Sequence, residues 1–132
     1  MFPETASVYV CYQDCTLLIR RDARDPNLPT FWESPGGHLD ILAEFPKDLD
    51  EIKREAAREL REETDIAVDA QELELLPAPH TTSAHCSFLL DLERLPQVRL
   101  SFEHDAYTWW NSSRPIPTKI RWQVSRFLKE RS

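Results

Sequence analysis

A chain of 132 residues, 41% hydrophobic and 30% charged, has the length and composition of one soluble globular domain with its own buried core. Its net charge of −7 argues against a general nucleic-acid binder, which needs a basic surface, but not against a small phosphorylated substrate accompanied by a metal ion. No apolar run could span a membrane, the N-terminus does not resemble a secretory signal, and three cysteines without a close pair are typical of reduced thiols in a cytoplasmic protein.

The first third of the chain predicts a hairpin followed by a segment that contains glycine. Alternating apolar residues predict a strand over Thr5–Tyr12, and a second strand over Cys15–Arg21 follows a two-residue link. A polar loop then leads to the segment 31–40, which holds Gly36 and Gly37, the only glycines of the chain. Because glycine permits close approach to the backbone, the pair predicts either a ligand-binding loop or a plain turn.

The middle of the chain predicts a helix, and the rest predicts further strands and a second helix. Asp48 is a suitable N-cap, Glu51 completes a capping box, and the helical pattern continues to about Thr64. The later strand candidates are 66–68, 72–76, 83–92, 98–102 and 107–110, and a terminal helix is predicted over 118–130. The order β-β-(loop)-β-α-β-β-β-α predicts a single domain over 1–132, an α/β or α+β sandwich with a mixed sheet and helices on its faces.

The first predicted helix concentrates negative charge on one side. Glu55, Glu59, Glu62 and Glu63 crowd together there, although like charges three or four positions apart repel by about 0.2–0.5 kcal/mol per pair. At about 100° per residue, Glu63 falls within the apolar stripe that faces the core. A carboxylate in that position must be paired, protonated or bound to a metal, and Mg²⁺ prefers oxygen ligands. A solvated helix end with an ion pair to an arginine is the other interpretation of the same spacing.

These residues resemble the signature of the Nudix hydrolases, G-x5-E-x7-R-E-U-x-E-E-x-G-U, in which U is a bulky aliphatic residue. The matching residues are Gly37, Arg58, Glu59, Leu60, Glu62, Glu63 and Ile66. Three departures accompany the match. Asp50 stands in place of the first glutamate, seven extra residues lie around 41–47, and Asp65 replaces the second glycine. Position 65 favours a left-handed residue after the helix, a conformation that aspartate tolerates less well than glycine.

The resemblance implies a Nudix-like α/β/α sandwich and hydrolysis of a nucleoside diphosphate linked to another group X. In this chemistry, divalent cations hold the diphosphate while water attacks a phosphorus atom. The implied cofactor is Mg²⁺, with Mn²⁺ as an alternative. The implied metal ligands are Glu59, Glu62 and Glu63 with the carbonyl of Gly37, and Arg58 would orient a glutamate by a charge-assisted bond. An ordinary helix ion pair is the alternative role for Arg58.

The remaining site candidates lie outside the box. Glu103 would be a further metal ligand or a general base, and His104 would contact a phosphate, but both also fit a solvated turn before a strand. His38 follows the glycines closely enough to line the site. Trp32 is one of several aromatic residues that could stack on a base, a contact worth about 1–3 kcal/mol in single-strand binders.

Two rival functions stay open at this point. One is a Nudix-fold module that binds or senses a nucleotide without cleaving it, and the other is an acidic α/β protein whose glutamates merely bind cations. For the enzyme, the Glu103-His104 segment resembles Nudix enzymes that act on nucleoside or pterin triphosphates. The expected partner is a small phosphorylated substrate, in the first instance a nucleotide, with no nucleic acid and no membrane. The chain is expected to be a monomer or a homodimer.

Overall fold

The computed structural model describes residues 3–39 and 48–131 of the chain. The expected insertion at 41–47 therefore lies outside the described residues. The strands are β1 (Thr5–Tyr12), β2 (Cys15–Arg21), β3 (Trp32–Glu33), β4 (Gly36–His38), β5 (Glu74–Leu75), β6 (His85–Leu92) and β7 (His104–Trp110). The helices are α1 (Leu49–Thr64), the short 3₁₀ helix η1 (Ala70–Glu72) and α2 (Trp122–Glu130).

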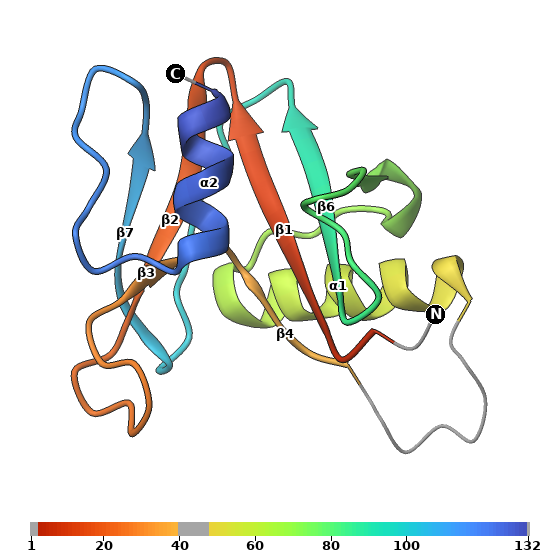
Figure 1. Ribbon diagram of the computed structural model, residues 1–132, viewed down its shortest axis with the longest axis horizontal. Coiled ribbons are helices and arrows are strands. Elements are labelled where there is room, and N and C mark those ends of the chain that lie inside the picture. Colours follow the sequence, from red (N-terminus) through yellow and green to blue (C-terminus); the bar gives the residue numbers. More distant parts are fainter. Residues whose placement is uncertain (1–2, 40–47, 132) are drawn as a thin grey trace.

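The seven strands form one mixed sheet (Figure 1). Its main order is β3-β2-β1-β6-β5, with β4 paired to β1 and β7 paired to β2. The pairing of β1 with β6 is parallel along the whole length of both strands, and the other pairings are antiparallel. Strands of both directions therefore meet in one sheet, as the sequence predicted.

The two strands of the first hairpin separate soon after the turn. Cys11 pairs with Thr16 and Tyr12 with Cys15, but no further pairs join β1 to β2. Beyond that point the free edge of β1 pairs with β4, and the free edge of β2 pairs with β3. The segment that carries the two glycines thus fills the space between the separating strands, which places it in the middle of the sheet.

Alternation along β1 assigns each residue to one of two layers. Val8 and Val10 join the core cluster that contains the buried face of α1, whereas Tyr9 and Cys11 join the cluster that contains α2. The two helices accordingly cover opposite faces of the sheet (Figure 1). This arrangement confirms the α/β/α sandwich that the sequence implied.

Helix α1 forms where the sequence predicted it, because capping residues at both ends hydrogen-bond to its terminal backbone groups. Asp48 is the N-cap, and its carboxylate accepts a bond of 2.8 Å from the backbone N–H of Glu51. The C-cap is Asp65 in the left-handed conformation, with φ of 62°, and its N–H bonds to the carbonyl of Arg61. Ile52, Ala56 and Leu60 make the buried stripe.

Two predicted strands are wrong. Residues 66–68 form no strand, although Ile66 is buried in the core. Residues 98–102 also pair with no strand, because their backbone serves the end of α1 instead. The N–H groups of Arg99 and Ser101 bond to the carbonyls of Thr64 and Glu63, at 2.9 and 3.2 Å. These carbonyls would otherwise lack partners at the helix C-terminus.

The terminal helix starts later than its periodicity predicted, at 122 instead of 118. Ile120 forms a parallel β-bridge with Trp32, in which the Trp32 N–H bonds to the carbonyl of Lys119. The N–H of Arg121 in turn bonds to the carbonyl of Trp32. This extended backbone cannot be helical, so α2 begins only after it. Among the described residues, no helix is long and apolar enough to cross a membrane.

Candidate active site

The acidic side of α1 lies against the glycine strand β4. The backbone N–H of Gly36 donates a hydrogen bond of 2.7 Å to Glu63 Oε1. Glu63 is 5% exposed, as its place in the apolar stripe predicted. A Cβ atom added to Gly37 would lie 3.2 Å from the carboxyl carbon of Glu59. Glycine at this position therefore leaves the space in which the Glu59 carboxylate sits.

The pKa values of Glu59 and Glu63 are both raised, by burial and by the charges of neighbouring carboxylates. Burial is the main reason why the pKa of Glu63 is raised to about 8, and the charges of Glu33, Glu59 and Glu103 act in the same direction. The Gly36 N–H opposes this shift. The pKa of Glu59 is also raised, first by burial, while Arg58 opposes the shift. Like charges held this close favour either protons or a cation between them.

Arg58, also on α1, does not line the pocket but forms ion pairs with two glutamates of the same helix. Its guanidinium contacts Glu62 at 2.8 Å and Glu59 at 3.4 Å. The side chain of Glu62 is 56% exposed, yet Glu62 also lines the pocket described below. Arg58 therefore forms the helix ion pair and, through the same contacts, fixes how Glu59 and Glu62 are presented.

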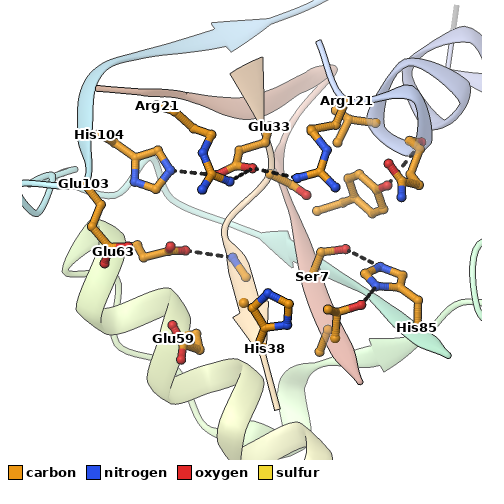
Figure 2. A pocket seen from close by; sticks show the side chains of 18 of the residues that line it. Ser7, Arg21, Glu33, His38, Glu59, Glu63, His85, Glu103, His104 and Arg121 are labelled. Atoms are coloured by element: carbon orange, nitrogen blue, oxygen red, sulfur yellow. Dashed lines mark hydrogen bonds and ion pairs between the residues drawn. The ribbon is translucent and has the colours of Figure 1, made fainter. Parts of the chain in front are cut away.

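The carboxylates face a pocket of about 470 Å³, which is large enough for a nucleotide-sized ligand. Figure 2 shows Glu59, Glu63 and Glu103 along one side of it, with Ser7 and His85 along the other. The residues that line it come from the strands β1, β2, β3, β4 and β6, from the loop after β2, from α1, from the turn before β7 with the first residue of that strand, and from the start of α2. The separation of β1 from β2 is what allows these distant segments to meet.

A divalent cation fits the chemistry of this donor set. Glu59, Glu63 and Glu103 offer hard oxygen ligands, and a bound cation would offset both the burial and the repulsion that raise the pKa values of Glu59 and Glu63. Within residues 3–39 and 48–131, no three Asp, Glu, His or Cys side chains lie close enough together to form a metal site as they stand.

Glu33 is the centre of a second polar cluster at the upper side of the pocket (Figure 2). Its carboxylate accepts from Arg21 at 3.1 Å and from His104 Nε2 at 2.8 Å, and Arg121 lies 3.6 Å away. The pattern of the sequence did not identify Glu33, Arg21 or Arg121. For Glu33, the available signal was a single charged residue in the otherwise uncharged run 31–35 just before the glycines.

The structure brings most of the predicted site residues together. Those that line the pocket are Gly37, His38, Glu59, Glu62, Glu63, Glu103 and His104. Trp32 does not line it, since its ring packs against the α2-side core and lies under the guanidinium of Arg20 at 5.6 Å. Asp50 also stays outside, in the first turn of α1, where it accepts a bond of 3.4 Å from Gln71.

His104 differs from the solvated turn residue that was its alternative interpretation. It is 5% exposed and its Nε2 is held by Glu33, while Nδ1 is buried without a hydrogen-bond partner among the described residues. Its neighbour Glu103 does lie in an exposed turn. Nδ1 of His104 is thus an unsatisfied buried polar atom in a residue that lines the pocket, a feature common at functional sites.

Comparison with known proteins agrees with this geometry. A family model described as the NUDIX domain matches residues 1–130. A NUDIX hydrolase from Nitrosomonas europaea is 22% identical with a TM-score of 0.68, over 99% of this chain and 73% of that chain. An Ap4A hydrolase from C. elegans is 24% identical with a TM-score of 0.57, over 82% of this chain and 80% of that one.

A third similar structure is the NUDIX domain of Shewanella oneidensis NrtR complexed with ADP ribose. It is 16% identical with a TM-score of 0.64, over 99% of this chain and 88% of that chain. Another similar protein is longer, and the chain spans 44% of its length. The comparison with curated proteins finds no match. At these identities the structural likeness establishes the fold alone.

The chain belongs to the Nudix family, because the family model covers nearly all of it. The expected enzyme class, a Nudix pyrophosphohydrolase, is confirmed at the level of this family.

Proposed function

We propose that the protein hydrolyses a diphosphate bond in a nucleoside diphosphate linked to another group X, with a divalent metal ion as cofactor. The observation that carries this proposal is the buried Glu63 carboxylate, which faces a ligand-sized pocket together with Glu59 and Glu103. A buried carboxylate with a strongly raised pKa is costly to maintain and is typical of functional sites.

The chain's own residues divide the work of the reaction. Glu59, Glu62, Glu63 and the Gly37 carbonyl are the candidate metal ligands, and Arg58 holds two of the glutamates in place. Glu103, in the turn beside the C-terminal end of α1, is the candidate to accept a proton from the attacking water or to complete the metal shell. When bound, Mg²⁺ or Mn²⁺ would neutralise charge on the diphosphate and lower the pKa of water.

Two polar residues would orient the substrate. His104, whose ring Glu33 fixes, is the candidate contact to a phosphate group. His38 lies at the rim beside the glycines and lines the same pocket. The names of two similar structures refer to Ap4A and to ADP ribose, both of which contain a nucleoside diphosphate. That shared unit supports a nucleotide substrate here, with nucleoside triphosphates as further members of the class.

The test is release of phosphate, pyrophosphate or nucleoside monophosphate from a panel of nucleotides. The panel holds nucleoside triphosphates, Ap4A and ADP-ribose, each with Mg²⁺, with Mn²⁺ and with a chelator. We expect metal-dependent turnover that Glu63→Gln lowers by at least about 100-fold, since metal stabilisation of the transition state is worth several kcal/mol. The matched control is Glu93→Gln, an exposed carboxylate outside the pocket, which should retain activity.

A nucleotide-binding module without turnover is the second candidate function. It is favoured by the position of Asp50, which stands in place of the first glutamate of the signature but lies outside the pocket and bonds to Gln71. Saturable binding of ADP-ribose or a triphosphate, with no product formed from any member of the panel, would support this candidate against the first.

A further inference from the structure

The side of the pocket opposite the carboxylates is built from three polar residues of β1 and β6. Thr5 and Ser7 are alternate residues of β1, so both side chains lie on the face of the sheet that α2 covers. The parallel register sets Thr5 beside His85 of β6. His85 Nδ1 lies 2.5 Å from Thr5 Oγ1, and its Nε2 lies 3.1 Å from Ser7 Oγ. Thr5, Ser7 and His85 are called the polar wall below.

The polar wall carries no fixed charge of its own. Burial lowers the pKa of His85, and the nearby Arg121 acts in the same direction, so both favour the neutral imidazole. Gln123 and Arg121, at the start of α2, are the other polar residues on this side of the pocket. The wall itself offers a phosphate no opposite charge, and the nearby Arg121 already lies 3.6 Å from the carboxylate of Glu33. A neutral polar group can bond to the wall.

The hydrogens in the polar wall leave one donor for a ligand. A neutral imidazole donates from one nitrogen and accepts at the other. Whichever tautomer is present, one hydroxyl donates to the ring and the other accepts from it. When the Thr5 hydroxyl accepts from the ring, it keeps its own hydrogen for a ligand, whereas the Ser7 hydroxyl also hydrogen-bonds to the side chain of Tyr9. The wall can exchange these roles by changing the tautomer.

A sugar hydroxyl matches a wall of this kind. A hydroxyl both donates and accepts, so it finds a partner in either tautomer, whereas the edge of a base presents donors and acceptors in a fixed order. Stacking gives no alternative contact here. Tyr9 is the one Phe, Tyr or Trp among the pocket-lining residues that the structure describes, and it is 1% exposed and stacks on Phe127 at 3.9 Å.

We propose that Thr5, Ser7 and His85 bind the sugar of the nucleotide and make the protein select ribose over deoxyribose. This proposal rests on the nucleotide substrate of the proposed function. In Figure 2, Ser7 and His85 lie across the pocket from Glu59, Glu63 and Glu103, so the sugar and the diphosphate would occupy opposite sides of it. The selection follows because a deoxy sugar leaves a wall hydroxyl without its partner.

The test is a binding measurement that needs no turnover. The probes are AMP, GMP, CMP and UMP, followed by the 2′-deoxy and 3′-deoxy forms of whichever binds best, titrated by calorimetry. We expect at least one deoxy form to bind about 10-fold more weakly to the wild type, as one unmet hydrogen bond in a pocket predicts. In Ser7→Ala and Thr5→Val, the ribose and deoxyribose forms should bind within about 3-fold of each other.

Two controls separate this proposal from the proposed function. Ser125→Ala removes a hydroxyl from α2 outside the pocket and should keep the wild-type preference. Glu63→Gln should also keep the preference for ribose, even if it abolishes turnover. The proposal is overturned if no monophosphate binds, if the wild type binds both sugars equally, or if Ser7→Ala and Thr5→Val change the preferred base but not the preferred sugar.

Discussion

The carboxylate of Glu63 accepts a 2.7 Å hydrogen bond from the backbone N–H of Gly36, although the two residues stand 27 positions apart in the chain. This bond joins the acidic helix α1 to the strand that fills the gap between β1 and β2. It also uses one carboxylate oxygen and leaves the other for a ligand. The relative position of helix and glycine strand, on which the site depends, is therefore fixed in part by a site residue itself.

The two glycines should fail in different ways when a methyl group is added. A Cβ at Gly36 would lie 2.3 Å from the backbone oxygen of Ala6, and its φ of 157° also disfavours other residues. Gly36→Ala should consequently lower the free energy of unfolding by more than about 2 kcal/mol. At Gly37 the Cβ would meet the flexible carboxylate of Glu59 at 3.2 Å, so Gly37→Ala should remain folded but bind metal more weakly.

Urea unfolding and Mn²⁺ titration of the two variants measure this difference. Equal loss of stability in both, with unchanged metal affinity of folded Gly37→Ala, would contradict the assigned positions.

The metal-free protein should lose stability as the pH rises. The pKa of Glu63 is about 8 in the folded state and 4.5 as its ordinary value, so between these values the folded state keeps a proton that the unfolded chain has released. Stability then falls with increasing pH, by at most about 1.4 kcal/mol per pH unit for one proton. Urea unfolding in a chelator at pH 5.5, 6.5 and 7.5 measures the slope. Glu63→Gln should flatten it, and a variant with the wild-type slope would show that another group is responsible.

Asp65→Gly should stabilise the fold. Asp65 holds φ of 62° as the C-cap of α1, a conformation that glycine adopts without a steric penalty. We expect a gain of about 0.5–1 kcal/mol in the free energy of unfolding, seen as a higher melting temperature. Asp69→Gly is the matched control, because Asp69 has φ of −71° and its carboxylate caps η1. That variant should be slightly less stable than the wild type, and a gain of similar size in both would contradict the explanation.

Arg58→Gln should reduce activity more than stability. The guanidinium is half exposed, and an exposed helix ion pair contributes only about 0.3–0.5 kcal/mol. Loss of a residue that orients metal ligands typically costs about 10- to 100-fold in metal affinity or activity. Turnover and thermal unfolding of Arg58→Gln are compared with those of Arg54→Gln, an exposed arginine one turn earlier on α1. If both variants lose activity equally, Arg58 has no special role.

Local patterns in the sequence predicted those strands and helices in which apolar residues recur on one face. The alternation of Val8 and Val10 located β1, and the apolar stripe of α1 located Glu63 on the buried side. Patterns failed where a segment bonds to something other than its expected partner. The alternating residues 98–102 do turn Val98 and Leu100 to the core, but their N–H groups bond to the end of α1 and not to a strand.

The part of the site that the sequence did not predict is built from contacts between residues far apart in the chain. Glu33 meets His104 from 71 positions away, and Ser7 meets His85 from 78 positions away. Local spacing carries no information about such pairs. The polar residues at 5 and 7, which alternate with buried residues in β1, were a sign that the second face of this strand does more than fill the core.

Titration with Mn²⁺ shows whether the α1 carboxylates hold a divalent cation at the glycine strand. Calorimetric titration should show saturable binding to the wild type, with proton release at pH 7 because Glu63 must ionise. Glu59→Gln and Glu63→Gln should each weaken binding by at least about 10-fold, as loss of a charged ligand predicts, and Glu93→Gln should not. Binding of equal affinity in all four proteins, or none in the wild type, would contradict the account.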